Sequence, residues 1–382
     1  MLETKPALRD IGTTIFTVMS RLAHECGALN LSQGYPDYSG PKELLDAVAR
    51  HMQAGDNQYA PMAGAITLRE AIAGKAAALY GAAYDPDAEI TVTAGATQAI
   101  FTAIACLVRP GDEVVVFEPV YDSYIPGIRL AGGTPVRARL VFPGYRPDWD
   151  EVRRLITPRT RMIMINSPHN PSGSVWEEAD LRQLEALVRD SGIVVVSDEV
   201  YEHMVYDGAR HESVTRYPEL AARSFIVSSF GKTYHLTGWK IAYCLAPREL
   251  STEFRKAHQF ITFCVNTPCQ LGLADFMTAR PGWYAQLAAF YQAKRDFFRA
   301  ALAGSRFELL PCRGTYFQSV RYTALSDEPD RQLAERLTRQ IGVASIPVSV
   351  FYGDGEDNQV LRFCFAKSEE TLARAAERLC RL

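Results

Sequence analysis

Apolar positions along the chain alternate between two patterns, which predict strands and helices in turn. Short continuous apolar runs occur at 90–93, 113–117, 161–165, 193–197, 225–228 and 241–245. Such runs are typical of strands buried on both faces. Segments with apolar residues three and four positions apart, at 97–108 and 177–190, fit amphipathic helices between those strands. This alternation predicts an α/β fold built on a mostly parallel sheet.

The flanking regions follow other patterns and suggest a second, smaller unit. Before the strands, amphipathic helices are predicted at 15–26 and 41–52, followed by one whose inward face carries Leu68, Ile72 and Leu79. After the strands, the pattern predicts helices at 252–260, 269–278 and 284–302, strands at 307–310 and 316–320, a helix at 331–340, a loop at 346–355, a strand at 360–366 and a helix at 369–382. We therefore predict a large domain of residues 41–285 and a smaller α+β domain of residues 1–40 and 286–382.

Composition and charge exclude several classes of protein. A net charge of −3 over 382 residues gives no basic footprint for nucleic acid. The longest apolar run, 100–108, is too short for a membrane span, and the first ten residues lack the apolar core of a signal peptide. The eight cysteines are scattered without metal-site spacing. We expect reduced thiols, no bound metal and a cytoplasmic location.

Polar residues follow the predicted strands at the points where they end. These are Gly95-Ala96-Thr97, Tyr121, Asn170, Asp198 with Tyr201, and Ser229 with Lys232. Ligands of parallel sheets bind at the carboxyl ends of the strands, so we expect these residues to share one edge. Free N–H groups at the helix start after Gly95 would bind an anion. An amine such as that of Lys232, held in a partly dry pocket, can lose its proton or form a Schiff base.

Each of these residues also has an ordinary structural explanation. Lys232 fits a solvated lysine after a turn, and Asp198 fits a helix-start cap. The Asn170 segment is a natural turn, and the loop around Gly34 fits a plain turn as well. Arg362 fits a surface arginine on a strand. It is their predicted convergence at one edge of the sheet that favours a functional site.

Five motifs give the chain a clear resemblance. SSFGKTYHLTGWK (228–240), NPSG (170–173), SDEVYEH (197–203), EPVYDSY (118–124) and RFCFA (362–366) occur in the order found in class I/II aminotransferases. Those enzymes use pyridoxal phosphate (PLP) on the fold-type-I scaffold, a large domain with a mostly parallel sheet plus a smaller α+β domain. HQFITFCVNTPCQ (258–270) and IPVSVFY (346–352) are most similar to the methionine and kynurenine aminotransferase branch.

The resemblance implies a role for each residue around the cofactor ring. Lys232 would form the Schiff base with PLP and later move the proton from the substrate Cα. Asp198 would pair with the pyridinium nitrogen and keep the ring an electron sink. Tyr201 and Asn170 would bond to the phenolate oxygen of the ring, and Tyr121 would offer a flat face for stacking.

The resemblance also implies ligands for the phosphate and for the substrate. Gly95, the N–H groups of Ala96 and Thr97, the Ser229 hydroxyl and the Lys240 ammonium would hold the phosphate. Tyr59 would reach it from a neighbouring subunit, which implies a homodimer. Arg362 would grip the substrate α-carboxylate, beside Gly34, Tyr35 and Asn170. The partners would then be an amino acid and a 2-oxo acid.

The side-chain pocket gives a broader expectation. Phe16, Tyr35, Phe351 and the segment 263–266 are candidates to line it, although they also fit a structural role in an interface. They favour methionine, an aromatic amino acid, kynurenine or a glutamine-like donor. The same scaffold also supports a C–S β-lyase acting on cysteine conjugates or cystathionine. A ligand-sensing regulator would need a DNA-binding module for which 1–40 leaves no room, and an inactive relic disagrees with the presence of Lys232, Asp198 and Arg362.

Overall fold

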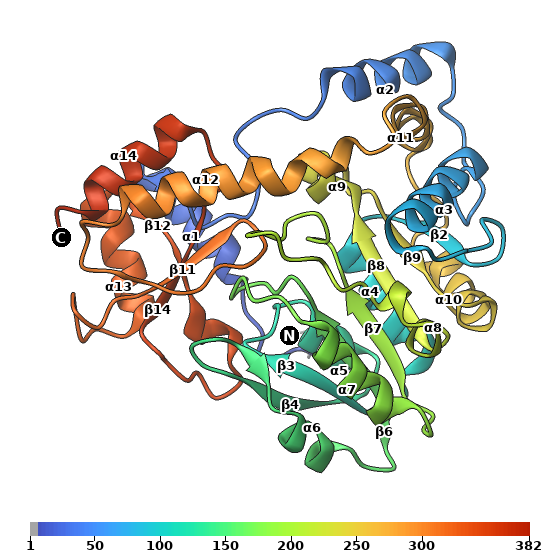
Figure 1. Cartoon of the computed structure of the whole chain (residues 1–382), viewed down its shortest axis with the longest axis horizontal. Coiled ribbons are helices and arrows are strands. Elements are labelled where there is room, and N and C mark those ends of the chain that lie inside the picture. The colour runs from blue at the N-terminus through green and yellow to red at the C-terminus, as the bar shows by residue number, and fades with distance from the viewer. Residues whose placement is uncertain (1–6) are drawn as a thin grey trace, which may run out of the picture.

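A computed structural model describes residues 7–382, and its largest element is an eight-stranded sheet (Figure 1). The strand order is β2 (Ile90–Thr93), β9 (Ala242–Leu245), β8 (Ser224–Ser229), β7 (Val194–Asp198), β6 (Thr160–Asn166), β3 (Glu113–Glu118), β4 (Thr134–Val141) and β5 (Arg146–Pro147). Strands β8, β7, β6, β3 and β4 are parallel, whereas β9 runs antiparallel to both of its neighbours. Strand β2 therefore points the same way as β8, so the carboxyl ends of β2, β8, β7, β6, β3 and β4 lie at one edge, whereas β9 and β5 run the opposite way.

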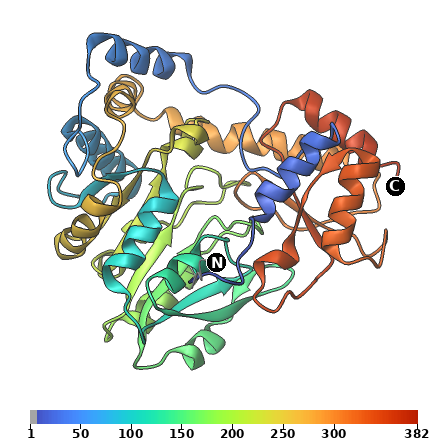
Figure 2. The same ribbon diagram turned by 180° about the vertical axis from the view of Figure 1, so that it is seen from behind.

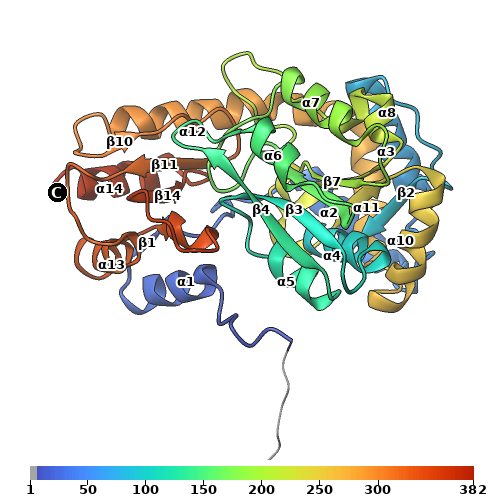
Figure 3. The same cartoon turned by 90° about the horizontal axis from the view of Figure 1, so that it is seen from below.

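The two faces of this sheet are covered by different helices, as Figure 3 shows. Helices α4 (Ala96–Leu107), α5 (Tyr124–Leu130) and α10 (Arg248–Ile261) lie on one face, and α6 (Trp149–Leu155), α7 (Glu178–Val188) and α8 (Pro218–Ala221) lie on the other. Successive strand residues face opposite sides: Val114 and Val116 join the core under α4, while Val115 joins the other core. Burial on both faces explains why the strands read as continuous apolar runs.

A second, four-stranded antiparallel sheet lies beside the large one. Its order is β10 (Glu308–Leu309), β11 (Phe317–Arg321), β14 (Val360–Cys364) and β13 (Ile346–Pro347). Nearby, β1 (Leu29–Asn30) pairs in parallel with β12 (Val343–Ala344), and α1 (Ile15–Glu25) packs against both (Figure 2). The N-terminal segment and the C-terminal part therefore build one unit.

Further helices complete this smaller unit and connect it to the large sheet. Helix α13 (Asp330–Arg336) continues into a π-helical turn at Leu337–Ile341. Helix α14 (Glu369–Leu379) packs on α12 (Leu287–Ala301), which crosses the upper half of the molecule in Figure 1 from the smaller sheet toward the larger one. Helices α2 (Lys42–Ala54), α3 (Ile66–Tyr80) and α11 (Thr267–Ala279) pack together beside β2 and β9. The division at residue 285, just before α12, stays a prediction.

Most predicted elements are present, and the differences have local causes. The sequence patterns missed α5, α6, β4 and β5, because β4 buries only alternate residues near its end and α5 contains Pro126 and Gly127. The predicted loop at 346–355 was wrong in its first half, which contains β13 and a 3₁₀ turn at Val348–Phe351. Leu79, predicted to face inward, is only partly buried. Within residues 7–382, no helix combines the length and apolar character needed to cross a bilayer.

Candidate active site

The strand ends open into a cavity of about 650 Å³ between the large sheet and the smaller unit. Most residues predicted for the site line it: Gly34, Tyr35, Gly95, Ala96, Thr97, Tyr121, Asn170, Asp198, Tyr201, Ser229, Lys232, Lys240 and Arg362, together with Phe16. On one side they lie at or just after the ends of β2, β3, β6, β7 and β8, and on the other side they come from residues 34–35 and β14. The predicted convergence at one edge of the sheet is therefore present.

Lys232 lies in the short helix α9 (Phe230–Thr233), directly after β8, and its half-buried side chain lines the cavity. Nζ donates hydrogen bonds to the Gly34 carbonyl oxygen at 3.2 Å and the Tyr316 hydroxyl at 2.7 Å. It also lies 5.5 Å from the centre of the Tyr201 ring. Burial lowers the pKa of Lys232 to about 8, with the positive charges of Lys240 and Arg362 acting in the same direction. Near pH 8 about half of these amines are neutral.

Asp198 is the last residue of β7 and is 5% exposed. Its Oδ2 accepts a hydrogen bond from the Tyr124 hydroxyl at 2.6 Å, and its Oδ1 accepts one from the Val200 N–H at 3.3 Å. Burial raises the pKa of Asp198 to about 6, although these two donors oppose the shift. A positively charged group beside this carboxylate would lower its pKa again, so the site favours a cationic partner.

Arg362 on β14 is fully buried, which excludes the interpretation as a surface arginine. Nη1 donates to the Asn170 side-chain oxygen at 2.6 Å, and Nη2 donates to the Ser32 carbonyl oxygen at 3.0 Å. The guanidinium lies 3.8 Å from the centre of the Phe317 ring, and its Nε has no partner within residues 7–382. A buried guanidinium with an unused donor, lining a cavity, is suited to bind a carboxylate.

The start of α4 forms the other end of the cavity. Gly95 precedes the helix with φ of +84°, a conformation that favours glycine. A Cβ at this position would lie 2.9 Å from Lys240 Cε and 3.1 Å from Lys240 Nζ. The ammonium therefore lies against the N-terminal end of the helix, where Ala96 and Thr97 also line the cavity. Free backbone N–H groups and a nearby ammonium make an anion site.

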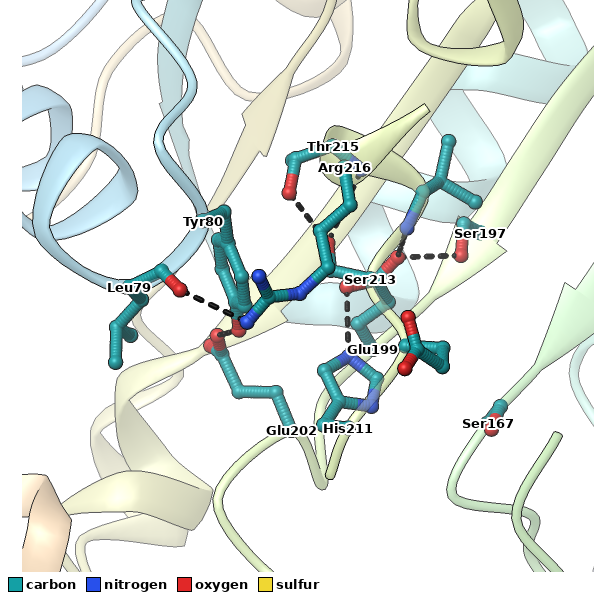
Figure 4. Close-up of polar contacts among 12 residues, drawn as sticks. Leu79, Tyr80, Ser167, Ser197, Glu199, Glu202, His211, Ser213, Thr215 and Arg216 are labelled. Carbon is teal, nitrogen blue, oxygen red and sulfur yellow. Dashed lines mark hydrogen bonds and ion pairs between the residues drawn. The ribbon is translucent and has the colours of Figure 1, made fainter. Parts of the chain in front are cut away.

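A buried polar network holds the segment that follows Asp198 (Figure 4). Glu199 accepts hydrogen bonds from the Ser197 hydroxyl at 2.8 Å and the Val214 N–H at 2.9 Å, and it pairs with His211 at 2.9 Å. These contacts fix the backbone on both sides of Asp198, because Ser197 and Glu199 are its chain neighbours.

An ion pair anchors the next turn of the same segment. Lys75 on α3 donates to Glu202 at 2.7 Å and to the Tyr243 hydroxyl at 2.9 Å, and the Tyr80 hydroxyl donates to the second Glu202 oxygen. Burial alone would raise the pKa of Glu202, but the Lys75 ammonium outweighs burial and the net direction is down. Along the chain, Tyr201 therefore lies between two carboxylates, those of Glu199 and Glu202, that buried contacts hold in place.

Some predicted residues lie away from the cavity in the single chain. Tyr59 is 82% exposed and packs edge-on against the Phe263 ring, with 5.3 Å between ring centres. Asn266 caps α11 by accepting from the Cys269 N–H. Phe351 is buried behind Phe16, with 5.9 Å between ring centres, and does not line the cavity. The predicted roles of Tyr59 and of 263–266 depend on a second subunit and stay predictions.

Sequence reasoning missed several side chains of the site. Tyr124, which bonds to Asp198, lies within the EPVYDSY motif, so the motif itself contained the signal. Asp122 of the same motif lines the cavity as well. Tyr316, which accepts from Lys232 and donates to the Gly34 carbonyl at 2.6 Å, gave no local signal, because 84 positions separate it from the lysine.

The comparisons with known proteins agree with this geometry. The family model described as aminotransferase class I and II matches residues 27–379. The chain belongs to the class I and II aminotransferases. This aminotransferase therefore transfers amino groups, and its fold is the α/β fold of that family, as the sequence motifs predicted.

The relatives of this aminotransferase cover its full length. The methionine aminotransferase of Escherichia coli is 52% identical over 375 residues, which are 98% of this chain and 97% of that protein. The kynurenine–oxoglutarate transaminase of Dictyostelium discoideum is 31% identical, over 97% of this chain and 94% of that protein. The crystal structure of YbdL from Escherichia coli, for which a methionine aminotransferase function was identified, superposes with a TM-score of 0.97 at 51% identity and covers 100% of both chains. The predicted similarity to the methionine and kynurenine branch is confirmed.

Proposed function

We propose that this aminotransferase binds pyridoxal 5′-phosphate in the cavity and transfers the amino group of methionine, an aromatic amino acid or a glutamine-like donor to a 2-oxo acid. One observation carries the proposal: the Lys232 amine, the Asp198 carboxylate and the Arg362 guanidinium line one cavity, with an anion site at the start of α4. The three groups provide a nucleophilic amine, a cation partner and a carboxylate clamp.

The residues present fit this cofactor. A phosphate matches the α4 start, where the space beside Gly95 leaves no room even for a Cβ and the Lys240 ammonium supplies positive charge. Ser229 and Thr97 line the same end with hydroxyl groups. A protonated ring nitrogen matches Asp198, whose raised pKa reports an anion buried without a cationic partner. Tyr121 would cover one ring face, and Asn170 and Tyr201 would hold the ring oxygen.

When bound, the cofactor supplies a conjugated ring that accepts the electron pair released at the substrate Cα. Lys232 is the base that takes the Cα proton, since its pKa of about 8 leaves much of it neutral near pH 8. Tyr124 and the Val200 N–H orient the Asp198 carboxylate and keep it ionised. The Glu199 and Glu202 contacts hold the backbone of that segment in place, so these groups need little rearrangement.

The substrate end of the cavity determines how the amino acid is held. Arg362 is fixed by Asn170 and Ser32 and keeps donors free for an α-carboxylate. Gly34 and Tyr35 line the same end, and Phe16 provides an apolar surface. These walls support a large, weakly polar side chain, which agrees with the similarity to methionine and kynurenine aminotransferases.

A homodimer would complete the site. Apolar side chains gather on one exposed surface, where Tyr59 is 82% exposed, Phe260 85% and Phe263 46%. Exposed aromatic clusters of this kind mark interaction surfaces. We propose that this surface binds a second copy and that Tyr59 reaches the partner's phosphate site. All eight cysteines are free thiols, five of them buried, which supports the reducing environment of the cytoplasm.

The test compares Lys232→Ala with Lys42→Ala, a surface lysine whose side chain is 84% exposed. With pyridoxal phosphate added, we expect the wild type and the Lys42 variant to show the visible absorbance band of the bound cofactor and to form 2-oxo acid from methionine. The Lys232 variant should lose both the band and the turnover. A Lys232 variant that keeps them would overturn the proposal. Release of ammonia, pyruvate and a free thiol from cysteine conjugates, in place of the 2-oxo acid that keeps the donor's side chain, would identify a β-lyase.

A further inference from the structure

One carboxylate that lines the cavity, that of Asp122, has no role in the proposed chemistry. Asp122 follows Tyr121 in the turn between β3 and α5 and is half-buried. It lines the main cavity and also the adjoining cavity of about 530 Å³, which reaches down along the N-terminal segment. Asp122 therefore lies at the junction of the two spaces, next to Pro126 and Thr14, which line both as well.

No side-chain donor bonds to Asp122 within residues 7–382. Two of the three arginines that line the adjoining cavity are engaged elsewhere, and the third, Arg331, is exposed and does not line the main cavity. Arg129 is paired with Asp10 at 2.6 Å, and Arg137 with Glu118 at 2.9 Å. Burial raises the pKa of the Asp122 carboxyl, and the charge of Arg362 opposes that shift only in part. The cavity thus contains an anion whose charge is not neutralised by a direct partner.

The cations that line the main cavity are also accounted for. Within the described residues they are Lys232, Lys240 and Arg362. In the proposed function Arg362 binds the α-carboxylate and Lys240 binds the phosphate. Lys232 acts as the base at the substrate Cα. A second carboxylate on the substrate side chain would find no free cation, and it would share the cavity with Asp122.

We propose that Asp122 is a specificity-determining residue, which excludes amino donors and 2-oxo acids that carry a side-chain carboxylate. The inference deepens the proposed function and rests on it. Two like charges in a partly buried cavity repel each other strongly, and juxtaposed like charges are a known way to reject wrong partners. Methionine and glutamine, whose side chains are neutral, escape this repulsion, whereas glutamate, aspartate and 2-oxoglutarate do not.

The kinetic test replaces the carboxylate with an amide of nearly the same shape, Asp122→Asn. At an effective dielectric constant of about 20, the repulsion between two like charges in one cavity corresponds to about tenfold or more in affinity. We therefore expect the ratio of kcat/KM for glutamate to that for glutamine to rise by about that factor, mainly through KM for glutamate. The matched control is Glu335→Gln, which removes a charge from an exposed residue that lines only the adjoining cavity. Its ratio should stay within about twofold of wild type.

A binding test separates this inference from the proposed function. Pentanoate and glutarate have the same chain length and differ by one terminal carboxylate, and neither reacts. We expect the cofactor-loaded wild type to bind pentanoate more tightly than glutarate. In Asp122→Asn the gap, which is the ratio of the Kd for glutarate to the Kd for pentanoate, should fall by about tenfold. An unchanged gap, or an Asp122→Asn variant that only loses glutamine activity without gaining glutamate activity, overturns the inference. A protein that transaminates no donor but shows the expected binding gap would refute the proposed function alone.

Discussion

The buried carboxylate of Asp198 destabilises the protein when no cationic partner is bound, and Asp198→Asn tests this. The pKa of this group is about 6, compared with 3.8 for an ordinary aspartate, because burial disfavours its charged form. A carboxyl with a raised pKa favours the folded state while it is protonated. That contribution is present below about pH 4 and is lost as the pH rises through 6.

The size of the effect follows from the difference of about two pKa units. Each unit corresponds to about 1.4 kcal/mol, so the ionised Asp198 lowers the free energy of unfolding by about 3 kcal/mol at pH 8. Roughly half of this cost is already present at pH 5, where the unfolded carboxyl is ionised and the folded one is not. The asparagine variant carries no such charge. We therefore expect it to be more stable than wild type by up to about 3 kcal/mol at pH 8.

The assay is urea unfolding of the cofactor-free protein at pH 5 and pH 8. The protein concentration is the same throughout, because the apparent stability of a dimer would change with concentration. The advantage of the variant should be about 1–2 kcal/mol larger at pH 8 than at pH 5. With the cofactor bound, the same variant should lose about 10²–10³-fold in turnover, because the site loses the negative charge of the Asp198 carboxylate. An advantage that does not change with pH, or a variant that is less stable at pH 8, would refute the reasoning.

Two other predictions concern the surroundings of the site. Lys75→Met leaves the Glu202 carboxylate buried without its cation, so the free energy of unfolding should fall by about 3–5 kcal/mol, and the double variant with Glu202→Leu should recover part of it. Denaturant midpoints check this, and a double variant no better than the single one would contradict it. Gly95→Ala should weaken cofactor binding, measured by absorbance titration, because its Cβ would press on the Lys240 side chain. Gly111→Ala is the matched control: φ is +96° there, but nothing lies within 4 Å of the added Cβ. Equal loss of binding in both variants would point to backbone strain alone.

Sequence reasoning predicted that these residues lie together because their placement depends on features that are local in the chain. Each polar cluster directly follows an apolar strand, and parallel strands bring their ends to one edge whatever the details of packing. Asp198 and Lys232 could therefore be placed in one cavity from periodicity and order alone. Arg362 needed the family motif, because a buried arginine and an exposed one on a strand look alike in sequence.

What the sequence left out is mostly non-local. The hydrogen bond from Lys232 to Tyr316 joins two sheets, and no pattern around either residue indicates it. Strand β4 was missed because its residues are exposed and buried in turn, with two arginines among them, while the neighbouring strands are continuous apolar runs. The strand β13 is only two residues long, Ile346–Pro347, and exists through its pairing with β14. Such elements are set by their neighbours rather than by their own periodicity.

The two ends of the cavity are formed by separate parts of the molecule. This matters for experiments that aim to change the substrate preference of the enzyme. Asp198 and Lys232 lie at the ends of strands of the large sheet, whereas Phe16 and Thr17 belong to α1, which packs on the smaller unit. Mutant libraries confined to α1 and the loop before it would therefore alter which amino acids are accepted while leaving the chemistry untouched.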